Sequence, residues 1–339
     1  MAPHGKRLTF GVIVFFLVLC TITAAALPSA ARRVTPTNLP PSAEGAAFPQ
    51  ARSRRPPRPA TTPAPTGYDR HVAFDNSLTD KSYYYTQGSF VSPSELELSG
   101  GKFPVEEERC VSPPNCLRLK WRSQSGGEWH MALELRRRYG SVDFSGSALS
   151  FWCYSETDLS ADESPLVYLN DASGEGTPSI RLIGSLEKLP ARRWVRVRLP
   201  FSSFVGLFKG TRDTPFDPRR LAKVTIVQGL DDGKPHTLYI DDVRVSDDRA
   251  GDVKAPAPPA GLGAKGYDRH VDLTWQPGKE ADLLHYKIYR SFDGKAYTPI
   301  GIQKGHVTRY ADFIGESGKP AYYKISAVDR SDNESPHSG

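Results

Sequence analysis

The segment Ala148–Ser155, with the sequence ALSFWCYS, decides the fold class of this chain. Leu149, Phe151 and Cys153 occupy every second position, and successive side chains of a β-strand point to opposite faces. Helical patterns are almost absent from the chain. The segment therefore predicts a β-strand with one face in a hydrophobic core.

Similar segments of alternating polarity extend on both sides of this strand and are separated by clusters of Gly, Pro, Ser and Asp. Such spacing is typical of an all-β sandwich, and eight strands suit a jelly roll. We expect this domain over residues 68–247. The predicted strands are Cys116–Arg122, Trp129–Leu135, Ala148–Tyr154, Leu166–Asn170, Ser179–Ile183, Trp194–Leu199, Lys223–Gln228 and Thr237–Val245.

The side of these strands that faces away from the core carries aromatic residues among polar ones. A sugar ring has apolar C–H faces and hydroxyl edges, so flat aromatic side chains flanked by polar groups suit a glycan. The alternative is that loops or Tyr83–Tyr85 cover this side, which makes the aromatic residues ordinary packing residues. The predicted ligand-binding residues are Trp152, Tyr154, Arg118, Lys120, Arg122, His130 and Glu134.

Three motifs carry a resemblance to a known family: FDNSL (Phe74–Leu78), ALSFWCYS (Ala148–Ser155) and HTLYIDDVRV (His236–Val245). Together they resemble galactose-binding-like jelly rolls, the fold of many carbohydrate-binding modules. The resemblance implies a structural calcium ion held by Asp75 and Asp242, since hard oxygen ligands suit calcium. The alternative is that Asp75 caps a turn and Asp242 ends a polar strand face.

A second module is expected at residues 259–339, after a Pro-rich linker at 248–258. It resembles a fibronectin type III domain, an immunoglobulin-like β-sandwich, through the strands His270–Trp275, Tyr286–Arg290 and Tyr322–Val328. Only ten residues follow Asp329, and they show no alternation. We therefore expect an incomplete domain without its last strand and with an unpaired strand edge.

The N-terminal residues predict export. Lys6 and Arg7 precede an apolar run, Leu8–Ala26, that ends in small residues, so residues 1–26 form a signal peptide or an uncleaved signal anchor. Residues 27–67 are rich in Pro, Ala and Arg and predict a disordered tether. The protein is expected to be secreted or otherwise extracytoplasmic, with a membrane contact only if the signal stays uncleaved.

The charge distribution argues against nucleic-acid binding. Of the 44 basic and 38 acidic residues, eight basic and one acidic residue lie in residues 1–68, which leaves 36 basic and 37 acidic residues for the remainder. Nucleic-acid binding needs clustered basic surface on a folded domain. No nucleic-acid partner is therefore expected.

Two cysteines enclose the short segment VSPPN, and an exported protein can oxidise such a pair. We expect a disulfide between Cys110 and Cys116 that closes this small loop. Cys153 lies inside an apolar strand and is expected to be a buried free thiol.

Catalytic motifs are missing from the sequence. The acidic pairs Asp231–Asp232 and Asp241–Asp242 are adjacent, so their side chains point to opposite faces of a strand, and no GxSxG, HExxH or phosphate loop occurs. The module order resembles the N-terminal region of bacterial secreted glucoamylase-like glucan hydrolases. We therefore expect a non-catalytic accessory protein, or the accessory region of a longer glycoside hydrolase, that binds a β-glucan-like polysaccharide. The alternative is a structural or protein-interaction spacer.

Overall fold

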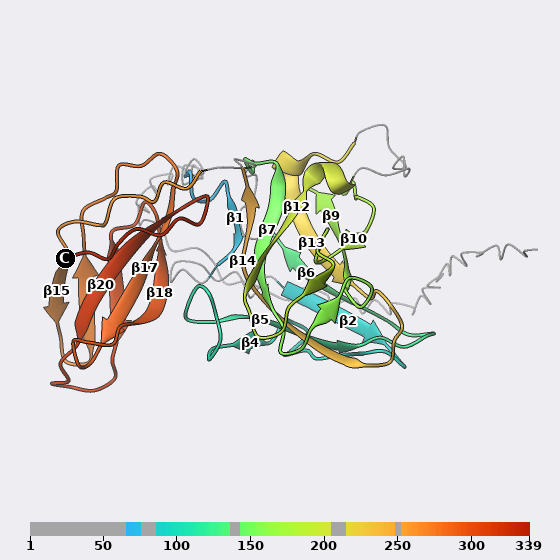
Figure 1. Ribbon diagram of the computed structural model, residues 1–339, viewed down its shortest axis with the longest axis horizontal. Coiled ribbons are helices and arrows are strands. Elements are labelled where there is room, and N and C mark those ends of the chain that lie inside the picture. The colour runs from blue at the N-terminus through green and yellow to red at the C-terminus, as the bar shows by residue number, and fades with distance from the viewer. Residues whose placement is uncertain (1–65, 76–85, 136–142, 205–214, 248–251) are drawn as a thin grey trace, which may run out of the picture. The chain divides into compact units, whose positions relative to one another are not determined.

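The computed structural model describes residues 66–75, 86–135, 143–204, 215–247 and 252–339, all of which lie in one compact unit, Thr61–Gly339. The predicted signal segment, the tether and Tyr83–Tyr85 lie outside the described residues. The described residues form β-strands and two short 3-10 helices, Phe201–Phe204 and Pro218–Arg220 (Figure 1). No helix among them is long and apolar enough to cross a membrane.

Two sheets form the first sandwich, and a small pair of strands, β8 (Leu159–Ser160) and β11 (Lys188–Leu189), flanks them. The seven-stranded sheet has the order β12 (Val195–Pro200), β7 (Ala148–Tyr154), β14 (Pro235–Ser246), β5 (Cys116–Arg122) and β3 (Glu95–Leu96), with β1 (Val72–Phe74) paired to β14 and β4 (Val105–Glu106) to β5. The five-stranded sheet has the order β10 (Ile180–Arg181), β9 (Leu166–Asp171), β13 (Leu221–Val227), β6 (Glu128–Glu134) and β2 (Thr86–Val91).

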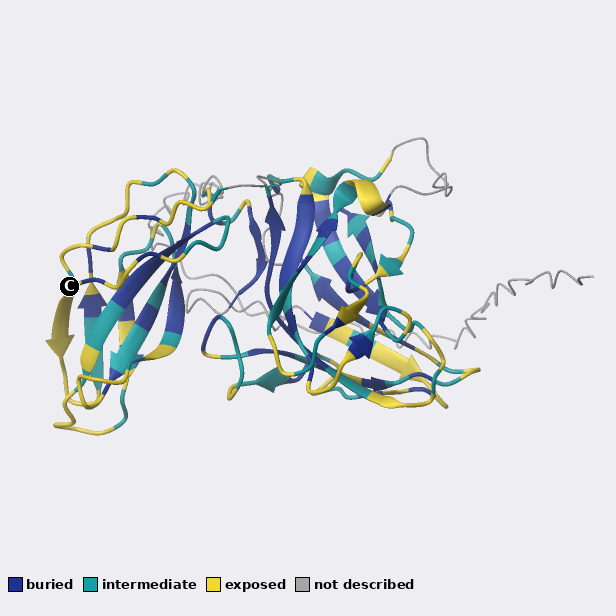
Figure 2. Ribbon diagram, viewed as in Figure 1, coloured by how far each residue is buried: buried dark blue, intermediate teal, exposed yellow. Residues whose placement is uncertain are grey.

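The hydrophobic core lies between these sheets, where the inward residues of both join one cluster. Leu119, Trp129 and Phe151 are almost fully buried, and each such side chain contributes about 1.5–3 kcal/mol when it leaves water. The indole N–H of Trp129 donates to the Ser123 hydroxyl at 3.1 Å, so its one polar atom is satisfied. The predicted all-β sandwich and its inward faces are confirmed (Figure 2).

The C-terminal module, residues 259–339, is a second and smaller sandwich. One sheet has the order β15 (Gly263–Gly266), β16 (His270–Thr274) and β19 (Arg309–Phe313), and the other has the order β18 (Thr298–Lys304), β17 (Leu283–Ser291) and β20 (Tyr322–Asp329). Trp275 and Tyr286 meet edge to face in its core, with ring centroids 5.2 Å apart. Its assignment to the fibronectin type III family stays a prediction.

The edge of β20 is less open than expected. The Ser335 amide donates to the Ala327 carbonyl at 2.8 Å and the Ser338 amide to the Ile325 carbonyl at 2.7 Å. The hydroxyls of both serines also accept bonds from amides of β20. The last residues therefore run alongside β20 and satisfy part of its edge, although they form no regular strand.

The expected disulfide is not present in the structure. Cys110, Cys116 and Cys153 are all free thiols, and the Cys116 thiol donates instead to the Arg109 carbonyl oxygen at 2.9 Å. Burial raises the pKa of Cys110 to about 12, which disfavours its thiolate. The prediction of a buried free thiol at Cys153 is confirmed.

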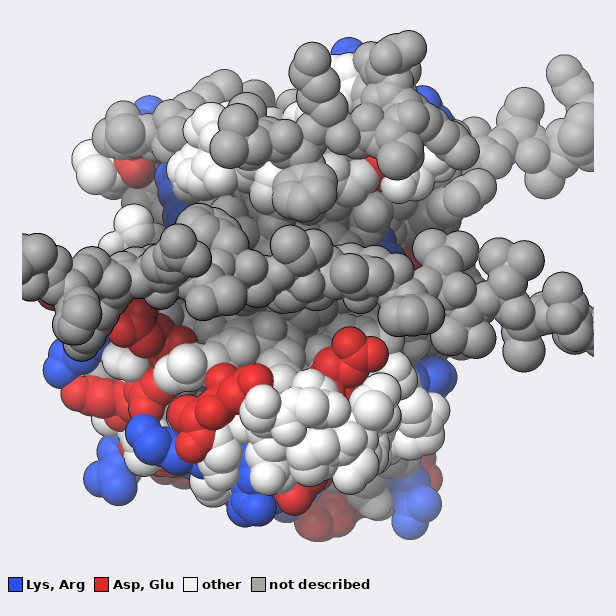
Figure 3. Space-filling model, turned by 90° about the vertical axis from the view of Figure 1, so that its right-hand side faces the viewer, with Lys and Arg blue, Asp and Glu red and all other residues white. Residues whose placement is uncertain are grey.

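Charged side chains of both signs are interspersed on the described part of the face in Figure 3.

On the seven-stranded sheet, Arg118 pairs with Glu97 at 2.7 Å and with Glu106 at 3.3 Å, and Arg122 pairs with Glu95 at 3.5 Å. Such partly exposed pairs contribute little to stability, about 0–1 kcal/mol each. They do neutralise the row of basic residues along β5.

Candidate functional site: the outer face of the five-stranded sheet

The side of the five-stranded sheet that faces away from the core is predominantly polar. In β6 the outward residues alternate with the buried Trp129, Met131 and Leu133. The strand register aligns the outward residues in rows across the sheet. One row contains Gln87, Ala132, Thr225 and Tyr168, and the next contains Ser89, His130, Val227 and Leu166.

A cavity of about 290 Å³ opens at this face. Its size is close to the lower end of small-molecule sites, which span about 300–1,000 Å³. The lining combines one phenol ring with acidic, basic, imidazole and amide groups. The lining residues are Glu128, Trp129, His130, Tyr168, Lys223, Val227 and Gln228.

Gln228 is held in a defined orientation at the rim of the cavity. Its Nε2 donates to the Gly127 carbonyl at 3.0 Å and to the Asp231 carboxylate at 2.6 Å. Its Oε1 is buried and has no hydrogen-bond partner among the described residues. The bonds of Nε2 therefore fix the Gln228 amide in place where it lines the cavity.

Two carboxylates lie on this face, but they are far apart. Glu128 and Glu134 begin and end β6, so roughly 20 Å of extended chain separates them at the ordinary rise of a strand. The paired acids of glycosidases stand about 5–9.5 Å apart. These two residues therefore cannot form such a pair with each other.

The ligand-binding residues predicted from the sequence do not form one site. His130 and Glu134 lie on the five-stranded sheet. The others lie on the seven-stranded sheet, and the outer faces of two packed sheets point in opposite directions. The residues on the seven-stranded sheet are Trp152, Tyr154, Arg118, Lys120 and Arg122.

On the seven-stranded sheet the predicted aromatic residues contact other side chains of the chain. The Arg196 guanidinium lies 5.5 Å from the centre of the Trp152 ring. Tyr154 contacts Trp194 at 5.5 Å, and the Arg109 guanidinium lies 4.8 Å from its ring. Both are partly buried. Lys120 is 3.7 Å from the Glu97 carboxylate, so it belongs to the ion pairs described above.

The two residues predicted to hold calcium, Asp75 and Asp242, are both buried, and Asp242 also lies beside two cations. Asp75 is 1% exposed, and Asp242 is bound by two guanidinium groups, those of Arg196 at 3.1 Å and Arg244 at 3.8 Å. A calcium ion at Asp242 would have to compete with both cations. The geometry does not favour a metal ion at Asp242.

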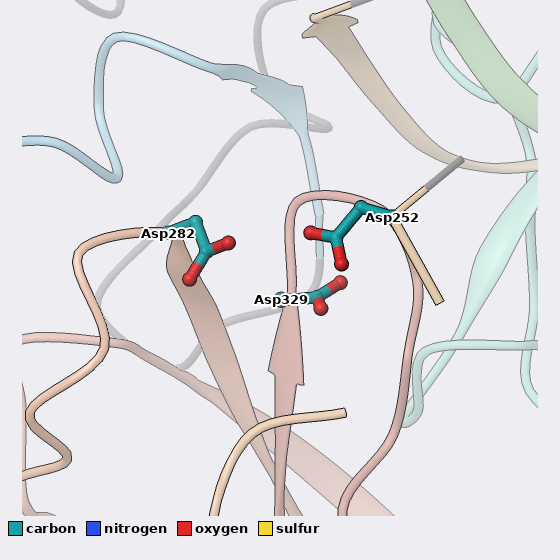
Figure 4. Close-up of side chains that lie close together, drawn as sticks. All are labelled: Asp252, Asp282 and Asp329. Atoms are coloured by element: carbon teal, nitrogen blue, oxygen red, sulfur yellow. The ribbon is translucent and has the colours of Figure 1, made fainter. Parts of the chain in front are cut away.

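Another group of three carboxylates lies in the linker, just before β17 and at the end of β20. One carboxylate oxygen each of Asp252, Asp282 and Asp329 lies within 4.8 Å of the others (Figure 4). However, Asp329 already accepts bonds from the amides of Ser331 at 2.7 Å and Asn333 at 2.9 Å. These bonds give Asp329 a structural role in the turn after β20.

Comparisons with known proteins give one clear relative. No family model matches the chain. The chain is 34% identical over 269 residues to an exo β-1,2-glucooligosaccharide sophorohydrolase (non-reducing end) of Parabacteroides distasonis, a match that covers 79% of the chain and 37% of the relative. The crystal structure of a β-1,2-glucanase from the same species matches with 33% identity and a TM-score of 0.69, over 79% of this chain and 38% of that one.

A family 30 carbohydrate-binding module from Clostridium thermocellum is also similar. It matches 49% of this chain and 93% of its own with 17% identity and a TM-score of 0.38. The chain spans less than two fifths of the length of the sophorohydrolase and of the glucanase that it matches.

These matches correct three expectations. The relative is an enzyme, which overturns the expectation of a non-catalytic accessory protein or region and its alternative of a spacer. It is also a β-1,2-glucanase and not a glucoamylase. Sequence reasoning missed the activity of this relative because the chain contains none of the catalytic motifs that were sought, although the module order resembled that of glucan hydrolases. Tyr168 lies on the outward side of β9, a position that the alternation of LVYLND predicts.

Proposed function

We propose that this protein is a glycoside hydrolase whose substrates are β-1,2-linked glucooligosaccharides. The observation that carries the proposal is the 34% identity to the sophorohydrolase over 269 residues. The first sandwich spans residues 68–247, so an alignment of 269 residues must extend beyond it. The TM-score of 0.69 with the β-1,2-glucanase structure supports the same conclusion.

We further propose that the glucan contacts the outer face of the five-stranded sheet. Glucose units offer hydroxyl groups at their edges and C–H groups on their faces. The cavity provides a matching set, because Tyr168 supplies a ring while His130, Lys223 and Gln228 supply polar groups. The seven-stranded sheet is less suitable, because its basic residues are already paired with glutamates.

Export of the protein also belongs to this proposal. Lys6, Arg7 and the apolar run Leu8–Ala26 support a signal segment. A polymeric glucan cannot enter the cell, so an enzyme that acts on it has to be located outside the cytoplasm.

Activity is tested with the protein produced from its complete reading frame. Incubation with β-1,2-glucooligosaccharides should release shorter products that chromatography separates. Oligosaccharides with β-1,3 or β-1,4 linkages serve as the control and should remain intact. If none of the β-1,2-linked substrates is cleaved, or if all linkages are cleaved equally, the proposed substrate class is wrong.

The binding face is tested with Tyr168→Ala. Loss of the ring should weaken binding of a β-1,2-glucooligosaccharide about tenfold in calorimetry, which corresponds to about 1.4 kcal/mol. Tyr322→Ala is the matched control, because Tyr322 is a 50% exposed tyrosine of the C-terminal module. Equal affinities of Tyr168→Ala and the unchanged protein would remove this face from the proposal.

A further inference from the structure

A turn of the C-terminal module contacts the first sandwich through charged side chains. The turn follows β20 and comprises residues 330–333. Asp332 forms an ion pair with Arg196 at 2.8 Å and a close one with Arg244. Arg330 donates to the His71 imidazole at 2.9 Å and to the Asp247 carboxylate at 3.2 Å. Each of these bonds joins residues of different sandwiches.

The two arginines need more negative charge than their own ion pairs within the first sandwich supply. Arg244 is 1% exposed, and the side chain of Arg196 is 20% exposed. Within the first sandwich both pair with one carboxylate, that of Asp242. A buried charge without a partner is strongly destabilising. Asp332 supplies the second carboxylate, so the four groups together are neutral.

The backbone has an unusual conformation at both carboxylates, Asp242 in the first sandwich and Asp332 in the C-terminal module. The register of β14 shifts between Asp241 and Arg244, which marks a bulge, and Asp242 within it has φ 47°. Asp332 has φ 69°. Non-glycine residues adopt this left-handed region at a cost, and they remain there when the surrounding contacts compensate for it. Here both aspartates bind the same two arginines.

An apolar contact accompanies the charged one. Tyr68 and Val72 of the first sandwich form a separate buried cluster with Leu284 of β17. Lys304 binds the Asp69 carboxylate at 3.1 Å, and its ammonium group lies 5.3 Å from the centre of the Tyr68 ring. The contact therefore combines a buried apolar centre with charge complementarity, which is the pattern of a specific interface.

We propose that the two sandwiches form one cooperative body in which Asp332 acts as an ionic lock between them. The lock is the group of Arg196, Asp242, Arg244 and Asp332. The C-terminal module supplies the carboxylate that neutralises the buried arginines of the first sandwich, so the two sandwiches do not behave as independent domains joined by a linker.

The lock is tested with Asp332→Asn, because asparagine keeps the size and tolerates positive φ but lacks the charge. Calorimetry of the unchanged protein should show one unfolding transition. Asp332→Asn should instead show two transitions. The midpoint temperature of the lower one should lie at least about 5 °C below that of the unchanged protein. Glu316→Gln, which removes an exposed ion pair with Lys319 in the same module, is the control and should leave the transition unchanged.

Small-angle scattering gives a second measurement on the same proteins. The radius of gyration should increase in Asp332→Asn and stay constant in the control. Two separate transitions in the unchanged protein, or an Asp332→Asn protein with the same transition and radius, would overturn the proposal. If Asp332→Asn fails to fold, Arg196→Gln probes the pair from the other side with the same two measurements, and an unchanged transition there would be equally decisive.

Discussion

Acid should destabilise this protein through His285, and replacing that residue by glutamine should remove the effect. The side chain of His285 is buried in β17, and burial lowers its pKa from 6.5 to about 3, with Lys287 and Arg244 acting in the same direction. In the unfolded chain the imidazole takes up a proton below about pH 6.5, whereas the folded protein keeps it neutral. Stability is therefore complete above pH 6.5 and is lost as the pH falls toward the folded pKa.

The size of the effect follows from the pKa difference. Each pH unit between the two pKa values changes the free energy of unfolding by about 1.4 kcal/mol for one proton. Because the unfolded imidazole is already half protonated at pH 6.5, a change from pH 6.5 to pH 4.5 should cost about 2.3 kcal/mol through His285 alone. Asp241 acts in the opposite direction, because burial raises its pKa to about 7 and the folded protein keeps its proton up to that pH. The pH dependence of the unchanged protein is therefore a sum of opposing contributions.

A difference measurement isolates the histidine. Urea unfolding of the unchanged protein and of His285→Gln, followed by tryptophan fluorescence, should be compared at pH 6.5 and pH 4.5. Asp241 is present in both proteins, so its contribution cancels. The unchanged protein should lose about 2.3 kcal/mol more than the variant over this range. Equal losses in the two proteins would refute the assignment of acid sensitivity to His285.

Three further outcomes are expected. Gly127→Ala should lower the free energy of unfolding by about 2 kcal/mol, because a Cβ there would lie 2.3 Å from the Ser94 amide nitrogen; urea titration measures this. Phe151→Ala should cost about 3–5 kcal/mol by leaving a core cavity, and an unchanged midpoint would contradict the packing. The Cys153 thiol should react with a disulfide reagent only after denaturation, because it is fully buried.

The strands with apolar residues at every second position were predictable from the sequence. The bounds of β5 and β7 match the predicted segments Cys116–Arg122 and Ala148–Tyr154. Several strands were not predicted, and one of them, β18 (TPIGIQK), contains Pro299 and Gly301, which disfavour a strand locally. Its pairing with β17 provides the stability that its own residues lack.

The site was only partly predictable because alternation does not tell which sheet a strand joins. It placed both His130 and Trp152 on outward sides, and both are outward in the structure. The strand order then separates them, since β6 lies in the five-stranded sheet and β7 in the other. Sheet membership depends on contacts between residues far apart in the sequence, such as Val227 with His130.

The long strand β14 has a consequence for natural variation and for engineering. It pairs with β5 along its first half and with β7 and β1 near its bulge. Deletion of a single residue before the bulge would turn Leu238 and Ile240 toward solvent and put polar groups in the core. The strand should therefore accept many replacements but almost no change of length. Only the stretch around Asp242, where the ladder is already interrupted, has room for an additional residue.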